Sequence, residues 1–232
     1  MVPMAPSSPA FPDLTVVLAL KQLRDAKSRL THPAVTHRQA LVLAMFTDTV
    51  LAAQAVRPGR IVVVSPDPAV REHARALGVQ TVDEPAGGGL NAALVHGAAG
   101  APGAVAFLQA DLPALRAGSL QQALTAAGDH PAAFVADREG SGTTLLVRAH
   151  RTALHPSFGP GSAQAHRRAG AVELDPAHRR WPDLRRDADT VEDLAACAAL
   201  GLGSCSQQVL SSSVSPSSTR RPARASSGDR EQ

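Results

Sequence analysis

Tyrosine is absent from the 232-residue sequence, and aromatic residues of all kinds make up only 3% of it. Proteins that bind single-stranded nucleic acids stack the bases on aromatic side chains, so this composition argues against that class. The formal net charge is +3, but residues 206–232 alone carry +2, which leaves +1 for the rest of the chain. We therefore expect no basic face and no nucleic-acid partner.

Long hydrophobic runs and a cysteine framework are also missing. The first apolar run covers residues 14–20 and ends at Lys21, which makes it too short for a signal sequence core or a membrane span. The two cysteines, Cys197 and Cys205, lie close together without the spacing of a metal site, so we expect two free thiols in a reducing compartment. These features predict a cytoplasmic protein without a membrane partner.

Lysine is almost missing as well. Only Lys21 and Lys27 are lysines among the 23 basic residues, and both follow the first apolar run within a few positions. A compact ammonium can reach a crowded oxygen atom, such as that of a polyphosphate, where a planar guanidinium does not fit. Contact with phosphate is one explanation for these two lysines, and chance retention in a helical turn is the other.

Apolar runs of strand length alternate with helix-length segments rich in alanine and leucine. This alternation predicts an α/β fold with a mainly parallel sheet covered on both faces, in which the pair of strands within 132–148 departs from the pattern. The predicted strands cover residues 14–20, 60–64, 79–82, 104–109, 132–136, 143–148 and 171–174. The predicted helices cover residues 34–56, 66–77 (ended by Gly78), a segment from 90, then 116–127, 162–169 and 190–200.

The two ends of the chain differ in composition from the rest. Residues 206–232 contain nine serines and four arginines with almost no large apolar residue, so they cannot bury a core. We therefore predict one domain over residues 13–204, a disordered tail rich in serine and arginine over 205–232, and a disordered N-terminus over 1–12.

Charged residues follow several of the predicted strands, and ligands of open α/β sheets bind at the carboxyl ends of the strands. Asp111 directly follows the strand at 104–109 and could hold Mg²⁺ together with substrate phosphates, or it could cap the next helix. Asp187 and Asp189 are two residues apart in an extended segment, which places both carboxylates on one side. Capping of the last helix is the alternative for this pair.

Two glycine-rich segments offer main-chain amides to an anion. The segment "AGGGLNAAL" around Gly88 matches neither a dinucleotide fingerprint nor a P-loop, so it is either a base- or phosphate-binding turn or a flexible turn before a helix. In "SFGPGSAQAH", amides near Gly159 and Gly161 and the hydroxyl of Ser162 converge at the start of a helix, with His166 on the same face. This segment predicts a phosphate site for a second substrate, and an ordinary capped helix is the alternative.

Seven segments in this order resemble the guanylyltransferases of coenzyme F420 biosynthesis, which act on phosphoenolpyruvate or 2-phospho-L-lactate. They are "LALKQLRDAKSRL", "LVLAMFTDTV", "GGGLNAAL", "LQADLPAL", "DREGSGTTLL", "FGPGSAQAH" and "DADTVEDL", and the resemblance covers residues 14–200. It implies a single-domain nucleotidyltransferase fold, which is a Rossmann-like three-layer sandwich with a mixed sheet. It also implies Mg²⁺-dependent use of GTP and cooperation with the downstream transferase of that pathway.

The same resemblance assigns roles to individual residues. The implied metal ligands are Asp111, Asp187 and Asp189, and the residues implied to bind the phosphorylated three-carbon acid are Thr144, Gly159 and Ser162. The implied nucleotide-binding residues are Lys21, Lys27, Gly88, Gly89 and Asn91, of which the two lysines would act in catalysis with Asp111. The composition is typical of a high-GC bacterium and favours phosphoenolpyruvate as the acceptor. The oligomeric state is left open.

Two other functions compete with this interpretation. A sugar- or molybdopterin-type nucleotidyltransferase would share the fold, but the loop after the first strand lacks the glycines of those enzymes. A nucleotide-binding module without catalytic activity is the alternative from another class. Turnover of GTP with candidate acceptors separates the three.

Overall fold

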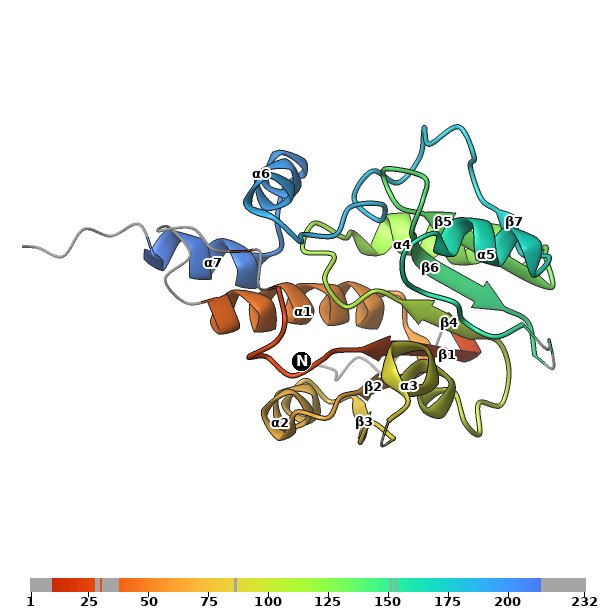
Figure 1. Ribbon diagram of the computed structural model, residues 1–232, viewed down its shortest axis with the longest axis horizontal. Coiled ribbons are helices and arrows are strands. Elements are labelled where there is room, and N and C mark those ends of the chain that lie inside the picture. The colour runs from red at the N-terminus through yellow and green to blue at the C-terminus, as the bar shows by residue number, and fades with distance from the viewer. Residues whose placement is uncertain are drawn as a thin grey trace, which may run out of the picture.

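The computed structural model describes residues 10–27, 30, 38–85, 87–150, 152 and 154–213. The strands in this part of the chain are β1 (Phe11–Ala19), β2 (Pro58–Val64), β3 (Gln80–Val82), β4 (Val105–Leu108), β5 (Ala132–Ala136), β6 (Thr143–Arg148) and β7 (Val172–Glu173). They form one sheet in the order β3-β2-β1-β4-β6-β5-β7 (Figure 1). Neighbouring strands pair in parallel, except that β6 is antiparallel to both β4 and β5. The predicted mainly parallel, mixed sheet is confirmed.

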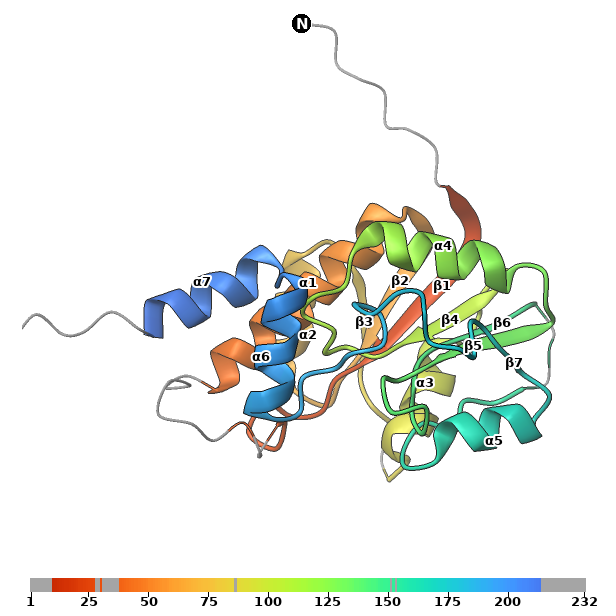
Figure 2. The same cartoon turned by 90° about the horizontal axis from the view of Figure 1, so that it is seen from above.

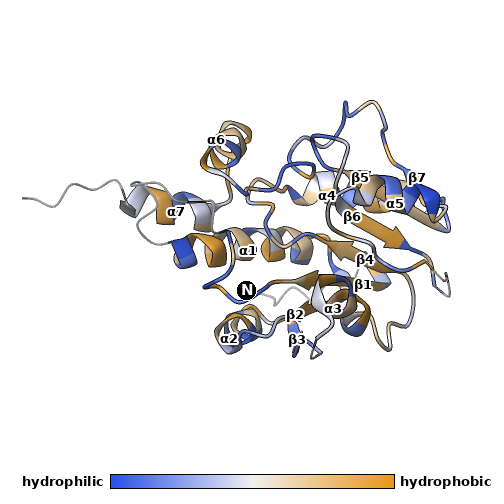
Figure 3. Ribbon diagram, viewed as in Figure 1, coloured by the Kyte–Doolittle hydropathy of each residue, from blue (hydrophilic) through white to orange (hydrophobic). Residues whose placement is uncertain are grey.

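Helices cover both faces of this sheet. They are α1 (Arg38–Ala55), α2 (Pro68–Ala76), α3 (Gly89–Gly97), α4 (Ala117–Ala127), α5 (Ser162–Arg168), α6 (Val191–Leu200) and α7 (Ser204–Ser213). One hydrophobic core joins the sheet to α1, α2, α4 and α6, and a second core joins its other face to α3 and α5. Because both faces are covered, strands such as β1, β4 and β6 are hydrophobic along most of their length (Figure 3). The three-layer architecture agrees with the prediction.

Local sequence signals set the boundaries of α2, which begins at Pro68, two residues after the predicted start at 66. The Asp67 carboxylate accepts a hydrogen bond from the main-chain N–H of Ala69 at 2.9 Å, and Pro68 occupies the first position of the helix. The helix ends before Gly78, whose φ of 77° lies in the left-handed region that favours glycine. For α1 the described helix begins at Arg38, and the predicted start at 34 lies outside the described residues.

The centre of the sheet has the topology of a ligand-binding edge. The chain leaves β1 through α1 toward β2 and β3, and it returns through α3 on the other face to β4, which lies beside β1. Strand order therefore changes direction between β1 and β4, and ligands bind at such a point outside the carboxyl ends of the strands. The loops that follow β1 and β4 carry Lys21, Lys27 and Asp111.

Disorder was predicted for residues 1–12 and 205–232, and this prediction is wrong for those of them that the structure describes. Helix α7 spans Ser204–Ser213 and packs beside α1 (Figure 2), although its composition had predicted a disordered tail from residue 205. Its first amides are capped by Asp48, a buried residue of α1, whose carboxylate accepts from the N–H of Cys205 at 3.0 Å and of Ser206 at 2.9 Å. Residues 214–232 lie outside the described residues.

At the N-terminus, β1 already begins at Phe11, within the segment predicted to be disordered. Residues 1–9 lie outside the described part of the chain. Among the described residues, no helix combines the length and the apolar character that a membrane crossing requires. Both cysteines are free thiols, as predicted.

Candidate active site

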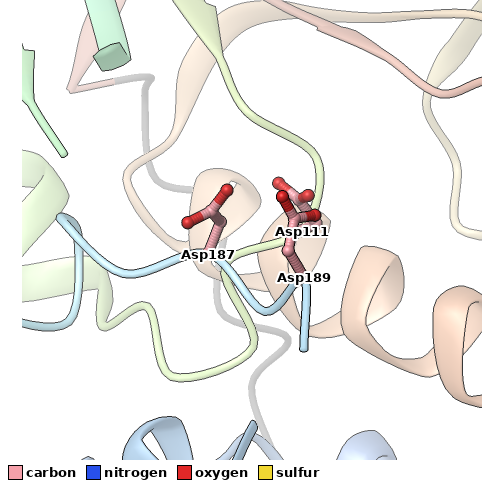
Figure 4. A group of neighbouring side chains, drawn as sticks. All are labelled: Asp111, Asp187 and Asp189. Atoms are coloured by element: carbon pink, nitrogen blue, oxygen red, sulfur yellow. The ribbon is translucent and has the colours of Figure 1, made fainter. Parts of the chain in front are cut away.

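Three carboxylates meet at the carboxyl end of the sheet (Figure 4). Asp111 lies in the segment that follows β4, whereas Asp187 and Asp189 lie in the extended segment between β7 and α6. One oxygen atom from each side chain lies within 4.8 Å of the others. The structure thus brings together the residues that the sequence assigned to one metal site, and we call them the acidic cluster.

Helix capping does not account for these aspartates. Helix α4 begins at Ala117, well beyond Asp111, and its N-cap is Arg116. Helix α6 is capped by Thr190, whose hydroxyl oxygen accepts from the N–H of Asp193 at 3.1 Å while the Asp193 carboxylate accepts from the N–H of Thr190. The acidic cluster is therefore left to interact with something other than a helix end.

Lys27 is the cation of this cluster. Its ammonium forms ion pairs with both Asp111 and Asp189, and its side chain is only 10% exposed. Burial alone would lower the pKa of Lys27, but the two carboxylates outweigh burial and hold the pKa above its usual value. The residue also has a φ of 52°, a left-handed conformation that is uncommon outside glycine. The contact of Lys27 with a triphosphate stays a prediction.

Asp187 is the carboxylate of the cluster without an ion pair among the described residues. Burial, together with the charges of Asp111 and Asp189, raises the pKa of the Asp187 carboxyl to about 7, although Lys27 opposes this shift. Three acidic groups thus share one ammonium. Oxygen ligands of this kind are those that Mg²⁺ prefers, and one or two of them commonly suffice when substrate phosphates complete the shell. The residues present therefore fit a magnesium ion.

The loop after β1 is anchored beside the cluster. Leu23, Ala26 and Leu30 are buried in the first core. The N–H of Leu23 also donates a hydrogen bond to the Asp67 carboxylate at 3.0 Å, so the residue that caps α2 also holds this loop. Lys21 is exposed and forms no ion pair with any described residue.

A cavity opens beside the acidic cluster. Its lining combines charged groups with an apolar wall formed by Leu20, Val42, Leu90, Leu94, Leu108 and Phe158. The polar side chains that line it are Lys21, Asp25, Lys27, Gln109, Asp111 and Asp189. Both lysines and two of the three predicted metal ligands therefore border one space, which is the arrangement required to hold a charged ligand against a metal ion.

The glycine-rich segment lies beside this cavity rather than in its wall. Gly88 and Gly89 are exposed at the start of α3, the helix that contributes Leu90 and Leu94 to the lining. Gly89 has a φ of 65°, which favours glycine. Their contact with a nucleotide stays a prediction.

Asn91 has a role that the sequence did not indicate. Its carboxamide oxygen accepts from the N–H of Phe158 at 2.7 Å, and its amide nitrogen donates to the carbonyl oxygen of Phe158 at 3.0 Å. The side chain thus clamps the segment that leads into Gly159 and Ser162. Direct binding of a nucleotide by Asn91 stays a prediction, whereas its positioning of this loop is visible in the structure.

The residues predicted to bind the acid do not line the cavity. Thr144 is fully buried in β6, and the hydroxyl of buried Ser162 donates to the Thr143 hydroxyl at 3.2 Å. Only Gly159 of the three is exposed, with a φ of 129° that favours glycine. Their binding of the acid stays a prediction, and Phe158 is the point at which this loop reaches the cavity.

His166 supports the same loop from α5. Its Nε2 accepts from the N–H of Ser157 at 3.0 Å, so its Nδ1 carries the proton and donates to the Thr143 hydroxyl at 2.9 Å. The imidazole is fully buried against the rings of Phe134 and Phe158, and burial lowers the pKa of His166 to about 4. The histidine is therefore neutral and structural.

Two features of the site were missed at the level of sequence. Gln109 lines the cavity two residues before Asp111, and the alternation of side chains along a strand would have placed it on the same side. The contact between Asn91 and Phe158 joins residues 67 positions apart, and no local pattern could have indicated it.

Comparison with known proteins identifies a family. Residues 42–172, more than half of the chain, match the MobA-like NTP transferase domain. A phosphoenolpyruvate guanylyltransferase of Mycobacterium sp. (strain KMS) is 47% identical over 206 residues, which cover 85% of this chain and 91% of the relative. A relative with the same name from Streptomyces scabiei is 48% identical, and the match covers 82% of this chain and 92% of the relative. Another from Geodermatophilus obscurus is 44% identical, and the match covers 93% of this chain and 99% of the relative.

Solved structures share the fold at low sequence identity. A nucleotidyl transferase from Methanothermobacter thermautotroptrophicus has a TM-score of 0.53 at 16% identity, covering 81% of this chain and 97% of that one. A 4-diphosphocytidyl-2C-methyl-D-erythritolsynthase from Anaerococcus prevotii has a TM-score of 0.52 at 9% identity, covering 80% and 96%. The predicted nucleotidyltransferase fold is thereby confirmed.

Proposed function

Because this chain belongs to the phosphoenolpyruvate guanylyltransferase family and is thus a nucleotidyltransferase, we propose that it joins the guanylyl group of GTP to phosphoenolpyruvate in coenzyme F420 biosynthesis. The products are a GDP-linked three-carbon acid and pyrophosphate. The observation that carries this proposal is the meeting of the acidic cluster with Lys27 at the edge of a cavity between β1 and β4.

The reaction requires no general base from the protein. A phosphate oxygen of the acceptor is already ionised at pH 7, and it forms a bond to the α-phosphorus of GTP while the bond from that phosphorus to the bridging oxygen of pyrophosphate breaks. The two reactants are anions, so the protein must hold them in line and reduce their repulsion. Lys21 lines the cavity, forms no ion pair with any described residue, and would bind the departing pyrophosphate.

The residues of the acidic cluster would hold Mg²⁺. When bound, such an ion supplies charge neutralisation between the phosphates of the two substrates. Lys27 would hold Asp111 and Asp189 in place through its two ion pairs. The segment that contains Asp187 and Asp189 is fixed by α6, whose Cys197 thiol lies 3.9 Å from the carbonyl oxygen of Asp187.

The two substrates would lie on opposite sides of the cluster. We place the nucleotide along β1, β4 and the start of α3, where Lys21 and the apolar residues Leu90 and Leu94 line the cavity. We place the acid beside the loop around Gly159, which Asn91 and His166 hold. The relatives named above, together with the composition of the chain, favour phosphoenolpyruvate over 2-phospho-L-lactate.

Pyrophosphate release by the purified full chain tests the proposal. With GTP and Mg²⁺ we expect release with phosphoenolpyruvate, less with 2-phospho-L-lactate, and none without an acceptor. ATP, CTP and UTP in place of GTP test the base, and omission of Mg²⁺ with a chelator present tests the ion. Release with a sugar 1-phosphate but not with the three-carbon acids would contradict the proposal, and GTP binding without any release would indicate a non-catalytic module.

A further inference from the structure

Gln109 leaves a buried hydrogen-bond acceptor without a partner beside the acidic cluster. Five buried side-chain atoms lack a partner within the described residues, namely Thr15 Oγ1, Arg60 Nε, Gln109 Oε1, Arg148 Nε and Ser206 Oγ. Gln109 alone among these residues lines the cavity that contains Lys27 and Asp111. Leaving a buried polar atom without a partner is unfavourable, so the carboxamide of a residue that lines a binding cavity is a candidate ligand contact.

The position of Gln109 is fixed by the sheet. Its main-chain N–H donates to the carbonyl oxygen of Thr144 at 2.9 Å, which continues the pairing of β4 with β6 beyond Leu108. β4 lies between β1 and β6, so the backbone of Gln109 cannot move aside easily. Two residues of extended chain span about 7 Å, so Gln109 is one short step from Asp111.

The chemistry of the atom limits its ligand. The other polar side chains of the cavity belong to lysines and aspartates, which suit phosphates or a metal ion, whereas a carboxamide is neutral. Its oxygen accepts hydrogen bonds and cannot donate them, so its partner must carry an N–H or O–H group. Fully ionised phosphoenolpyruvate has neither. A guanosine nucleotide has both, on its ribose and on its base.

We propose that Gln109 binds the nucleoside part of the nucleotide, with Oε1 accepting a hydrogen bond from a ribose hydroxyl or a guanine N–H group. This inference rests on the proposed function and deepens it by assigning a nucleotide contact to a residue of β4. Gln109 would thereby hold the nucleoside, while Asp111, two residues further along the chain, and the rest of the acidic cluster face the α-phosphate.

Equilibrium binding tests this contact independently of turnover. Gln109→Met keeps the length of the side chain and removes the carboxamide. Binding of GTP with Mg²⁺ to the full chain, measured by calorimetry, should weaken about 3- to 10-fold, as expected for one neutral hydrogen bond. The matched control is Thr15→Val, which removes another buried oxygen without a partner from a residue of β1 outside the cavity, and it should bind GTP as the wild type does.

Nucleotide analogues identify the donor group. The affinities of the wild type and of Gln109→Met are compared for four analogues, each of which lacks one hydrogen-bond donor of GTP. The analogues are 2′-deoxy-GTP, 3′-deoxy-GTP, inosine triphosphate and the triphosphate of 2-aminopurine riboside. The analogue that lacks the partner of Oε1 should bind both proteins equally, because the two deletions remove the same hydrogen bond. The analogues that keep the partner should still lose affinity on substitution.

Three results would overturn the inference. They are an unchanged GTP affinity in Gln109→Met, an equal loss for GTP and all four analogues, and a rise in the KM for phosphoenolpyruvate without weaker GTP binding. The last would assign Gln109 to the acid. Because the readout is binding, a protein that binds GTP but releases no pyrophosphate would contradict the proposed reaction and still decide the role of Gln109.

Discussion

The two halves of the carboxyl edge of the sheet handle polar groups in opposite ways. Around β1 and β4, charged groups lie at a cavity with unequal partners: three carboxylates share one ammonium, and Lys21 forms no ion pair with the described residues. Around β6 and α5, the polar groups are neutral and bond one another. We call the second group, Thr143, Ser157, Ser162 and His166, the neutral network.

This difference separates the groups that meet ligands from the groups that hold the scaffold. A satisfied buried polar group stabilises one arrangement of the chain, and changing it affects stability first. An unsatisfied charge at a cavity gains its partner only from a ligand, so changing it affects binding and turnover first. The comparison predicts distinct outcomes for substitutions in the two halves.

The largest effect is expected for Asp111→Asn in the acidic cluster. The amide has the same shape but lacks the charge that a metal ion and Lys27 require, so kcat should fall at least about 100-fold while the melting temperature is kept. Pyrophosphate release and thermal unfolding measure the two quantities. Near-normal turnover in this variant would remove Asp111 from the site.

A buried carboxylate elsewhere in the chain provides the matched control. Asp183 accepts from the N–H of Arg116 and from the Ser119 hydroxyl, both at 2.8 Å, and so holds the start of α4. Asp183→Asn should lower the melting temperature and leave kcat unchanged. If it reduced turnover as strongly as Asp111→Asn does, the proposed separation of roles would be wrong.

The neutral network predicts a dependence of stability on pH through His166. Its folded-state pKa of about 4 lies below the usual 6.5, so above pH 6.5 both the folded and the unfolded chain carry a neutral ring. As the pH falls from 6.5 toward 4, the unfolded chain binds a proton first, and the free energy of unfolding falls by up to about 1.4 kcal/mol for each pH unit. Below about 4 this loss levels off.

Urea unfolding of the wild type and of His166→Gln at pH 7, 6 and 5 measures this effect. Glutamine keeps an acceptor near Ser157 and does not titrate, so the stability of the variant should vary less with pH. Carboxylates titrate in both proteins and cancel in the difference. Equal slopes would show that His166 is not held neutral.

A smaller effect is expected for Lys27→Arg. The charge is kept, but a planar guanidinium cannot occupy the place of an ammonium that touches two carboxylates in a nearly closed space. We expect kcat to fall about tenfold, which corresponds to roughly 1.4 kcal/mol of transition-state stabilisation. Lys21→Arg is the comparison, since Lys21 is exposed and should tolerate the larger group better. Equal kinetics for Lys27→Arg and the wild type would contradict the argument from size.

Chain geometry made the acidic cluster plausible but left helix capping open for its aspartates, and the resemblance implied that the three form one metal site. Asp111 follows an apolar strand, and the carboxyl ends of parallel strands meet at one edge. Asp187 and Asp189 share a side because they alternate along an extended segment. The start of α2 at Asp67 and Pro68 was equally local. Such features follow from neighbouring residues alone.

The missed features depend on partners distant in the chain. The serine-rich composition of residues 206–232 predicted a disordered tail from residue 205, but Asp48, more than 150 residues earlier, caps helix α7 at its start. Ser162 offered a hydroxyl to an anion in the sequence, and in the structure that hydroxyl already bonds Thr143. Sequence patterns identify polar groups, but they do not show which of them the fold has already satisfied.

The smallest effect tests whether the clamp of Asn91 on Phe158 serves the acid or the nucleotide. Asn91→Ala removes both hydrogen bonds to the Phe158 main chain, so the loop around Gly159 should loosen. We expect the KM for phosphoenolpyruvate to rise about 3- to 10-fold and the amide of Phe158 to exchange faster with solvent, while the KM for GTP stays unchanged. Val95→Ala, an exposed position on the same helix, is the control.

A rise in the KM for GTP instead would restore the sequence-based assignment of Asn91 to the nucleotide. Helix α3 would then belong, together with β1 and β4, to the charged half of the edge.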